Sequence, residues 1–127
     1  MTAERNKQTP AEWTETPFSM EVSRLSEATV VQLRGSCTME HADAMTDKLV
    51  ELASKPQPKV IVDMAGLDFI ESTGLGGLVS GYLRARKNEG EVRLLAPPPF
   101  ILQLLKLTRL TQLFQVFDSI DDAVNQP

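Results

Sequence analysis

Two neighbouring segments in the first third of the chain have the pattern of strands, and apolar and polar residues alternate along the first of them. The segments are 18–25 (FSMEVSRL) and 28–35 (ATVVQLRG), and a short break at Ser26 and Glu27 separates them. Alternation with a period of two is typical of strands that are covered on one face and meet water on the other. The pattern therefore predicts two neighbouring strands.

A helical period follows these strands. Four apolar residues fall on one stripe of a helix: Ala42, Met45, Leu49 and Leu52. This spacing predicts an amphipathic helix over about residues 40–54, with Thr38 placed to cap its first turn. Pro56 and Pro58 come next, and the helix should end before them because proline cannot continue a helix.

The centre of the chain combines a strand pattern with a second helical pattern. Residues 59–64 (KVIVDM) form a nearly continuous, β-branched run. Such a run is typical of a strand that is covered on both faces, so we predict the central strand here. Apolar residues return to helical spacing from Leu75 to Tyr82, and the cations that precede Gly90 suit the C-terminus of this second helix.

Strand and helix signals continue to alternate to the end of the chain. Residues 91–96 (EVRLLA) predict a strand, residues 100–107 (FILQLLKL) a third helix, and residues 118–124 allow a short last helix. Strands that alternate with helices after an initial strand pair predict an α/β fold with a small mixed, mostly parallel β-sheet flanked by helices. Residues 1–16 are polar without a sustained period, so we expect a flexible polar tail followed by one domain over residues 17–127.

Two apolar features leave alternatives open. Trp13 lies in the polar tail, where an indole either packs back on the domain or contacts a partner. The third helix has only Gln103 and Lys106 as a polar stripe, so its apolar side chains either pack fully against the sheet or leave part of their surface outside the core. The residues in question are Phe100, Ile101 and Leu104.

Composition and charge exclude several classes of function. The chain has 127 residues, the size of one domain, and its net charge of -4 and pI near 5.0 argue against binding to nucleic acid or to an anionic membrane surface. No segment has the roughly 18 consecutive apolar residues of a membrane span, and the first residues lack the apolar core of a signal peptide. Cys37 is the only cysteine, so no internal disulfide can form. We expect a cytoplasmic protein.

The segment 69–77 (FIESTGLGG) is the strongest candidate for chemistry, yet it matches no catalytic pattern. A P-loop would need a lysine after its glycines, and none follows before Lys87. A dinucleotide-binding loop would need glycine where Val79 stands, and a hydrolase serine would need glycine where Ile70 stands. The only histidine, His41, is best interpreted as solvated or locally bonded. We therefore expect no catalysis by this chain, and no bound cofactor or metal.

Glycines crowd the helix that follows Ser72 and Thr73. One of the two hydroxyls could simply cap this helix, which is a common use of both residue types. Three glycines share one face of the helix and a fourth lies beside them: Gly74, Gly77 and Gly81, with Gly76. Interior glycines cost about 1 kcal/mol each relative to alanine, so a loss of about 2 to 3 kcal/mol must be offset. Either the helix is pressed tightly against the sheet, or its first turn is kept bare for another backbone, a phosphate or a partner.

Two long segments resemble the STAS domain of the bacterial anti-sigma factor antagonist family. The segments are 60–99 and 107–124, and the resemblance covers about residues 18–125. Its most specific piece is an apolar strand, a Gly-Leu-Asp-Phe-Ile turn and Ser-Thr-Gly-Leu-Gly at the start of a helix. The resemblance implies a STAS-like single domain, in agreement with the α/β fold expected from the pattern.

The resemblance also implies a site. In that family the first hydroxyl after the acidic residue is the phosphoacceptor, which is Ser72 in this chain, with Thr73 as the alternative. Glu71 stands where the family usually has aspartate. The residues expected to bind a partner are Asp68, Glu71, Ser72, Thr73, Gly74, Leu75, Gly76 and Gly77.

The function that the resemblance implies is partner switching. The unmodified antagonist would bind an anti-sigma factor that is also a serine kinase, which frees a sigma factor. The kinase would then phosphorylate Ser72 with its own ATP and release the antagonist, and a metal-dependent protein phosphatase would remove the phosphate. The alternative is a non-phosphorylated STAS scaffold, in a sensory complex or as the cytoplasmic subunit of a lipid transporter, in which Ser72 is only a cap.

Overall fold

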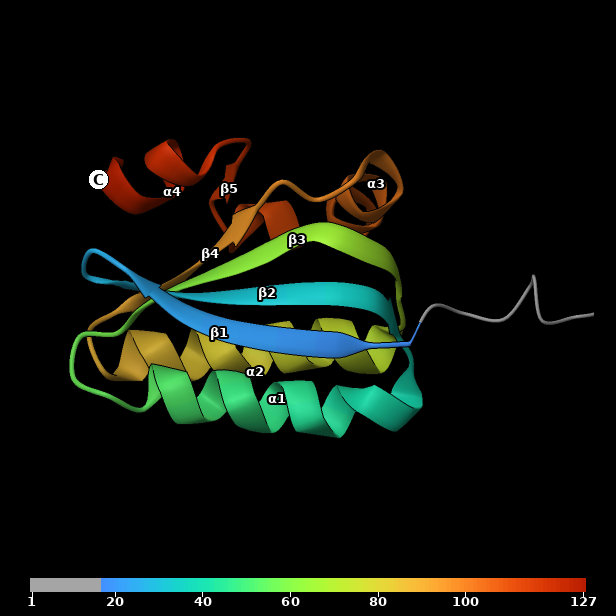
Figure 1. Cartoon of the computed structure of the whole chain (residues 1–127), viewed down its shortest axis with the longest axis horizontal. Helices are drawn as coiled ribbons and strands as arrows, with labels where there is room; N and C mark the ends of the chain where they lie inside the picture. Colours follow the sequence, from blue (N-terminus) through green and yellow to red (C-terminus); the bar gives the residue numbers. More distant parts are fainter. Residues whose placement is uncertain (1–16) are drawn as a thin grey trace, which may run out of the picture.

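Five strands form one sheet in which each strand pairs with the next in sequence. The computed structural model describes residues 17–127, and Trp13 lies outside them. The strands are β1 (Ser19–Leu25), β2 (Ala28–Cys37), β3 (Lys59–Ile70), β4 (Glu91–Leu95) and β5 (Val116–Phe117). β1 is antiparallel to β2, and all other pairs are parallel. The mixed, mostly parallel sheet expected from the sequence is therefore confirmed (Figure 1).

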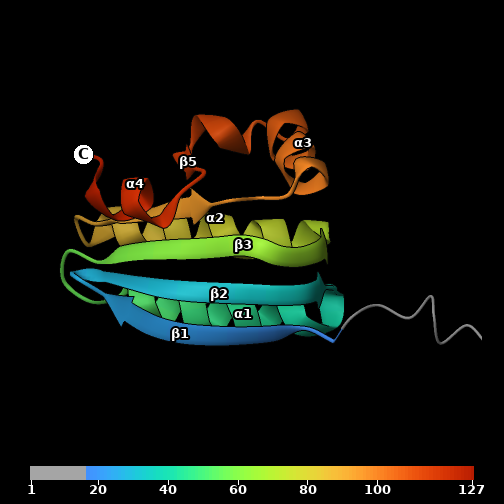
Figure 2. The same ribbon diagram turned by 45° about the horizontal axis from the view of Figure 1, so that its top comes forward.

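Helices cover both faces of this sheet. They are α1 (Met39–Ala53), α2 (Ser72–Lys87), α3 (Pro99–Leu107) and α4 (Ile120–Asn125), with a short 3-10 helix, η2 (Leu110–Gln112). α1 and α2 lie side by side on one face, and α4 lies on the opposite face (Figures 1 and 2). α1 follows β2 directly and α2 follows β3 directly, so both helices begin at the same edge of the sheet.

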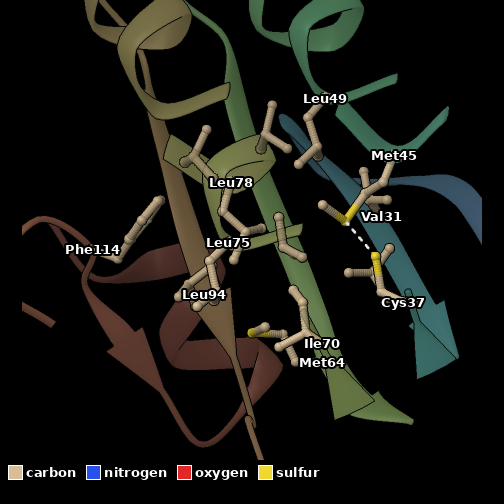
Figure 3. Close-up of a cluster of buried hydrophobic side chains, with 14 of the residues drawn as sticks. Val31, Cys37, Met45, Leu49, Met64, Ile70, Leu75, Leu78, Leu94 and Phe114 are labelled. Atoms are coloured by element: carbon tan, nitrogen blue, oxygen red, sulfur yellow. Dashed lines mark hydrogen bonds between the residues drawn. The ribbon is translucent and has the colours of Figure 1, made fainter. Parts of the chain in front are cut away.

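The main hydrophobic core lies between the sheet and the layer formed by α1 and α2 (Figure 3). Val31 from β2, Met64 from β3 and Leu94 from β4 are fully buried there, as are Met45 from α1 and Leu78 from α2. The apolar stripe predicted for the first helix is buried along its whole length. A smaller apolar cluster lies on the other face of the sheet, under α4. This core fixes the positions of α1 and α2, and therefore of their first turns.

The third strand is longer than the sequence predicts. The expected strand over residues 59–64 continues to Ile70, so the expected Gly-Leu-Asp-Phe-Ile turn is wrong. β3 pairs with β2 as far as Cys37, with two shifts in register along the pair. Leu67 and Ile70 are both buried although they are three residues apart, and an irregularity of the bulge type is what allows such spacing within a strand. The strand therefore delivers the chain directly to Ser72.

The third helix divides its apolar side chains between the core and the surface. Ile101 and Leu105 are fully buried, whereas Phe100 is 59% exposed and Leu107 is 73% exposed. Leu104 packs partly against the core. Part of the apolar surface of α3 thus remains outside the core.

Candidate functional site

Ser72 and Thr73 lie where β3 passes into α2. Ser72 is the first residue of the helix, Thr73 is the second, and both are exposed. Glu71 occupies the N-cap position, and its backbone carbonyl accepts hydrogen bonds from the N–H groups of Gly74 at 2.9 Å and Leu75 at 3.0 Å. Both hydroxyls are therefore inside the first turn, and the expectation that one of them caps α2 is wrong.

Glu71 joins the start of α2 to the start of α1. Its backbone N–H donates to the carbonyl of Cys37 at 3.0 Å, and its carboxylate Oε2 accepts from the backbone N–H of Met39 at 3.1 Å. Thr38 occupies the N-cap position of α1, as predicted, but its side chain makes no capping hydrogen bond. The carboxylate of Glu71 therefore satisfies one of the N–H groups in the first turn of α1 that have no acceptor within the helix.

Two helix N-termini lie next to each other at this edge of the sheet. Cys37, the last residue of β2, is paired with Ile70, the last residue of β3, so α1 and α2 start from neighbouring points. Each helix N-terminus carries a partial positive charge, which favours a negatively charged group nearby. Glu71 lies between the two starts, and Asp68 is exposed near the end of β3. The positive ends of two helices are thus already matched by one carboxylate.

Cys37 belongs to the core beneath this edge. Its side chain is fully buried, and its Sγ lies 3.9 Å from Sδ of Met45. Burial, together with the nearby negative charge of Glu71, raises the pKa of the Cys37 thiol to about 11. The thiol is consequently protonated at neutral pH, and its role is packing rather than nucleophilic chemistry.

The glycines of α2 serve two different purposes. A Cβ atom added to Gly77 would overlap Oγ1 of Thr46, and one added to Gly81 would lie 3.1 Å from Cβ of Leu49, so both glycines allow α2 to pack closely on α1. A Cβ atom on Gly74 would lie 2.7 Å from the Ile70 side chain. A Cβ atom on Gly76 would meet nothing within 4 Å. The close packing expected from the glycines is therefore present, against the sheet at Gly74 and against α1 at Gly77 and Gly81, whereas Gly76 leaves exposed backbone on the surface.

The residues expected to bind a partner differ in their exposure to solvent. Gly74 and Gly77 are buried, and Leu75 is only 7% exposed because it points into the core. The others are exposed or half-buried at one edge of the molecule: Asp68, Glu71, Ser72, Thr73 and Gly76. We call these five residues the Ser72 surface.

A family model decides which group the chain belongs to. The model described as "Mlab, STAS domain" matches residues 20–116, from the first strand to the start of the last. The chain belongs to the STAS domain family. The match includes the whole Ser72 surface, and it confirms the resemblance that the sequence motifs suggested.

Solved structures confirm the STAS fold. An anti-sigma factor antagonist from Mycobacterium paratuberculosis superposes with a TM-score of 0.74 at 24% identity, over 85% of this chain and 92% of that one. The unphosphorylated form of the anti-sigma factor antagonist SpoIIAA gives 0.73 at 15% identity, over 85% of this chain and 95% of that one. The phosphorylated form of the Bacillus protein SpoIIAA gives 0.66 at 18% identity, over 87% and 98%. Among proteins with curated descriptions, none matches the chain significantly.

The remaining features of the STAS domain do not belong to the Ser72 surface. A cavity of about 590 Å³ lies at the opposite end of the strands, where Lys59, Arg86 and Glu91 are among its lining residues. The His41 ring stacks on the ring of Phe18, with centroids 5.3 Å apart. Between residues 17 and 127, no group of three acidic, histidine or cysteine side chains is arranged to hold a metal ion. Within the same residues no helix combines the length and the apolar character needed to cross a membrane.

Proposed function

We propose that this STAS domain is an anti-sigma factor antagonist that switches partners through phosphorylation of Ser72. The observation that carries the proposal is the position of Ser72, which is exposed, is the first residue of a helix, and lies near the bare backbone of Gly76. A kinase can reach a hydroxyl in this position without unfolding any element. Two of the similar structures are named as anti-sigma factor antagonists, and a third is the phosphorylated form of SpoIIAA.

The proposed partner of the unmodified protein is an anti-sigma factor that is also a serine kinase, and the proposed place of action is the cytoplasm. The partner would bind the Ser72 surface, with Gly76 allowing its backbone to approach closely. Buried Gly74, Leu75 and Gly77 would support this surface from beneath without touching the partner. A metal-dependent protein phosphatase would return the protein to its binding state.

A phosphate at Ser72 is compatible with the fold and unfavourable in a complex. It would add about -1.5 to -2 charges at neutral pH, next to the positive end of α2, which stabilises negative charge in the free protein. In a complex the same phosphate would lie against Glu71 and Asp68 and would have to lose its water. Phosphorylation is therefore expected to weaken binding while the domain stays folded.

The test is incubation of the full chain with ATP and an anti-sigma kinase from the same organism, followed by intact mass and peptide mapping. We expect one phosphate on the wild type, one on Thr73→Ala and none on Ser72→Ala. A phosphate that persists in Ser72→Ala and disappears in Thr73→Ala would move the acceptor to Thr73. No phosphate on the wild type would contradict the switching mechanism.

A second candidate function is a STAS subunit that is not phosphorylated and serves as an interaction scaffold, in a sensory complex or beside a lipid transporter. The observation that favours it is the family model itself, which describes the STAS domain of Mlab rather than an antagonist. In this case Ser72 would only be part of the contact surface. A complex that forms with a partner and remains equally stable after exposure to kinase and ATP would support the scaffold.

A further inference from the structure

The carboxylate of Glu71 lies at a junction between the proposed phosphoacceptor and the neighbouring helix. Its Oε2 accepts a hydrogen bond from the N–H of Met39, the first residue of α1, although the two residues are 32 positions apart in sequence. Glu71 is also the N-cap residue of α2, and its backbone N–H donates a hydrogen bond to the carbonyl of Cys37. One residue therefore holds the first turns of both helices in place.

Met39 places an exposed apolar side chain at this junction, where a partner can contact it. The side chain of Met39 is 65% exposed and lies in the first turn of α1. Methionine is flexible and polarizable, and it adapts to different contacting surfaces. Any movement of the first turn of α1 would thus change the apolar part of the surface that lies beside Ser72.

A phosphate on Ser72 would act on Glu71 before it acts on any other residue. The two residues are adjacent in the chain, and both lie at the positive ends of α1 and α2. A phosphate carries about -1.5 to -2 charges and competes for the same free N–H groups, while it repels a neighbouring carboxylate. Asp68 adds a further negative charge near the end of β3. Within residues 17–127, the carboxylate of Glu71 is held by a single hydrogen bond, from the N–H of Met39; this bond is exposed to water and therefore weak enough to be lost.

We propose that Glu71 is a positioning residue that couples Ser72 to α1. While Ser72 is unmodified, the carboxylate fixes the first turn of α1 and the side chain of Met39; a phosphate on Ser72 displaces the carboxylate from the N–H of Met39 and releases this turn. The inference rests on the proposed phosphorylation of Ser72. It adds α1 as a second element through which the modification changes the binding surface.

The hydrogen bond itself is tested by NMR on the full, unmodified chain. A backbone N–H that donates to a side chain exchanges with water more slowly than a free one, so hydrogen exchange at Met39 should be about tenfold faster in Glu71→Ala, which removes the acceptor. Glu71→Gln keeps an acceptor oxygen and should change the exchange of Met39 less. The Ala65 N–H, which donates to Oδ1 of Asp63 at 3.0 Å in the middle of β3, is the internal control and should exchange equally in all three proteins. Exchange at Met39 that is the same in the wild type and in Glu71→Ala would overturn the proposal.

The coupling is tested with phosphoserine inserted at position 72 during translation, which makes the result independent of any kinase. We expect hydrogen exchange at Met39 to become about tenfold faster than in the unmodified protein. In Glu71→Gln, which has no charge to repel, phosphoserine should change the exchange of Met39 little. An exchange rate at Met39 that is unchanged by phosphoserine would overturn the coupling. Failure of a kinase to modify Ser72 would instead contradict the proposed function and leave these measurements intact.

Discussion

Replacing Gly76 and Gly77 by alanine separates the two purposes of glycine in α2. The two residues are neighbours in one helix, so the intrinsic gain from alanine is the same, about 1 kcal/mol of unfolding free energy in each case. A methyl group on Gly76 would meet nothing within 4 Å, and the gain should be realised in full. Gly76→Ala is therefore expected to stabilise the free domain by about 1 kcal/mol.

The same methyl group on Gly77 must displace α1. It would overlap Oγ1 of Thr46 and lie 3.1 Å from Cε of Met45. The methionine can move, but the Thr46 hydroxyl is bonded to the carbonyl of Ala42 at 2.8 Å, so rotation of Thr46 breaks a hydrogen bond. Overpacking of this kind costs about 1 to 3 kcal/mol, which equals or exceeds the gain in helix propensity. Gly77→Ala is expected to be less stable than Gly76→Ala by about 1 to 3 kcal/mol.

Urea unfolding of the wild type and both variants measures these differences directly. The wild type should lie between the two variants or level with Gly77→Ala, and the dependence of the unfolding free energy on urea should be the same in all three. Binding of the anti-sigma kinase should be weakened by Gly76→Ala, in spite of its greater stability, because the methyl group stands on the Ser72 surface. If Gly76→Ala destabilises the domain, or if Gly77→Ala stabilises it as much as Gly76→Ala does, our account of the glycines is wrong.

Three further predictions concern Ser72, the buried Cys37 and residues 1–16. Ser72→Ala should bind the kinase within about 1 kcal/mol of the wild type, whereas Ser72→Asp should keep the fold, since a carboxylate suits a helix N-terminus, and bind more weakly in titration calorimetry. The pKa of Cys37 is raised to about 11 in the folded state, so the protonated thiol contributes fully to the unfolding free energy below about pH 9, and roughly 2 kcal/mol is lost as pH rises toward 11. Cys37→Ala should remove this part of the alkaline loss in denaturant titrations. An unchanged dependence of the unfolding free energy on pH would refute the shift. Deleting residues 1–16, whose sequence carries no core pattern, should change the unfolding free energy by less than about 1 kcal/mol, and a larger loss would assign Trp13 to the core.

Local pattern was sufficient to predict most of the fold. The helical stripe of α1 follows a single period, and the β-branched run at the start of β3 is nearly continuous, so local pattern identifies the buried residues of both elements. β5 was missed because it has two residues, too few for a period to be recognised. The second half of β3 was missed because Gly66 and the three-residue spacing of Leu67 and Ile70 do not follow strand alternation.

The start of α2 was predictable from its residues, but the hydrogen bonds that connect it to the rest of the domain were not. The order Glu71, Ser72, Thr73 and the glycines after them are enough to locate the start of a helix. The hydrogen bond between Glu71 and Met39 depends on the pairing of β2 with β3, which places two distant segments side by side, and no local pattern records that. The same pairing brings α1 against α2, so the sequence could indicate close packing at Gly77 without naming Thr46 as the neighbour.

The central claim is that a phosphate on Ser72 releases the partner while the domain stays folded. The most direct measurement is the affinity of the anti-sigma kinase for two forms of the full chain, unmodified and with phosphoserine at position 72, together with the thermal unfolding of each form alone. The account predicts similar unfolding temperatures and an affinity at least about tenfold lower for the phosphorylated form, a difference of about 1.4 kcal/mol. Equal affinity of the two forms, or a phosphorylated form that is unfolded, would contradict it.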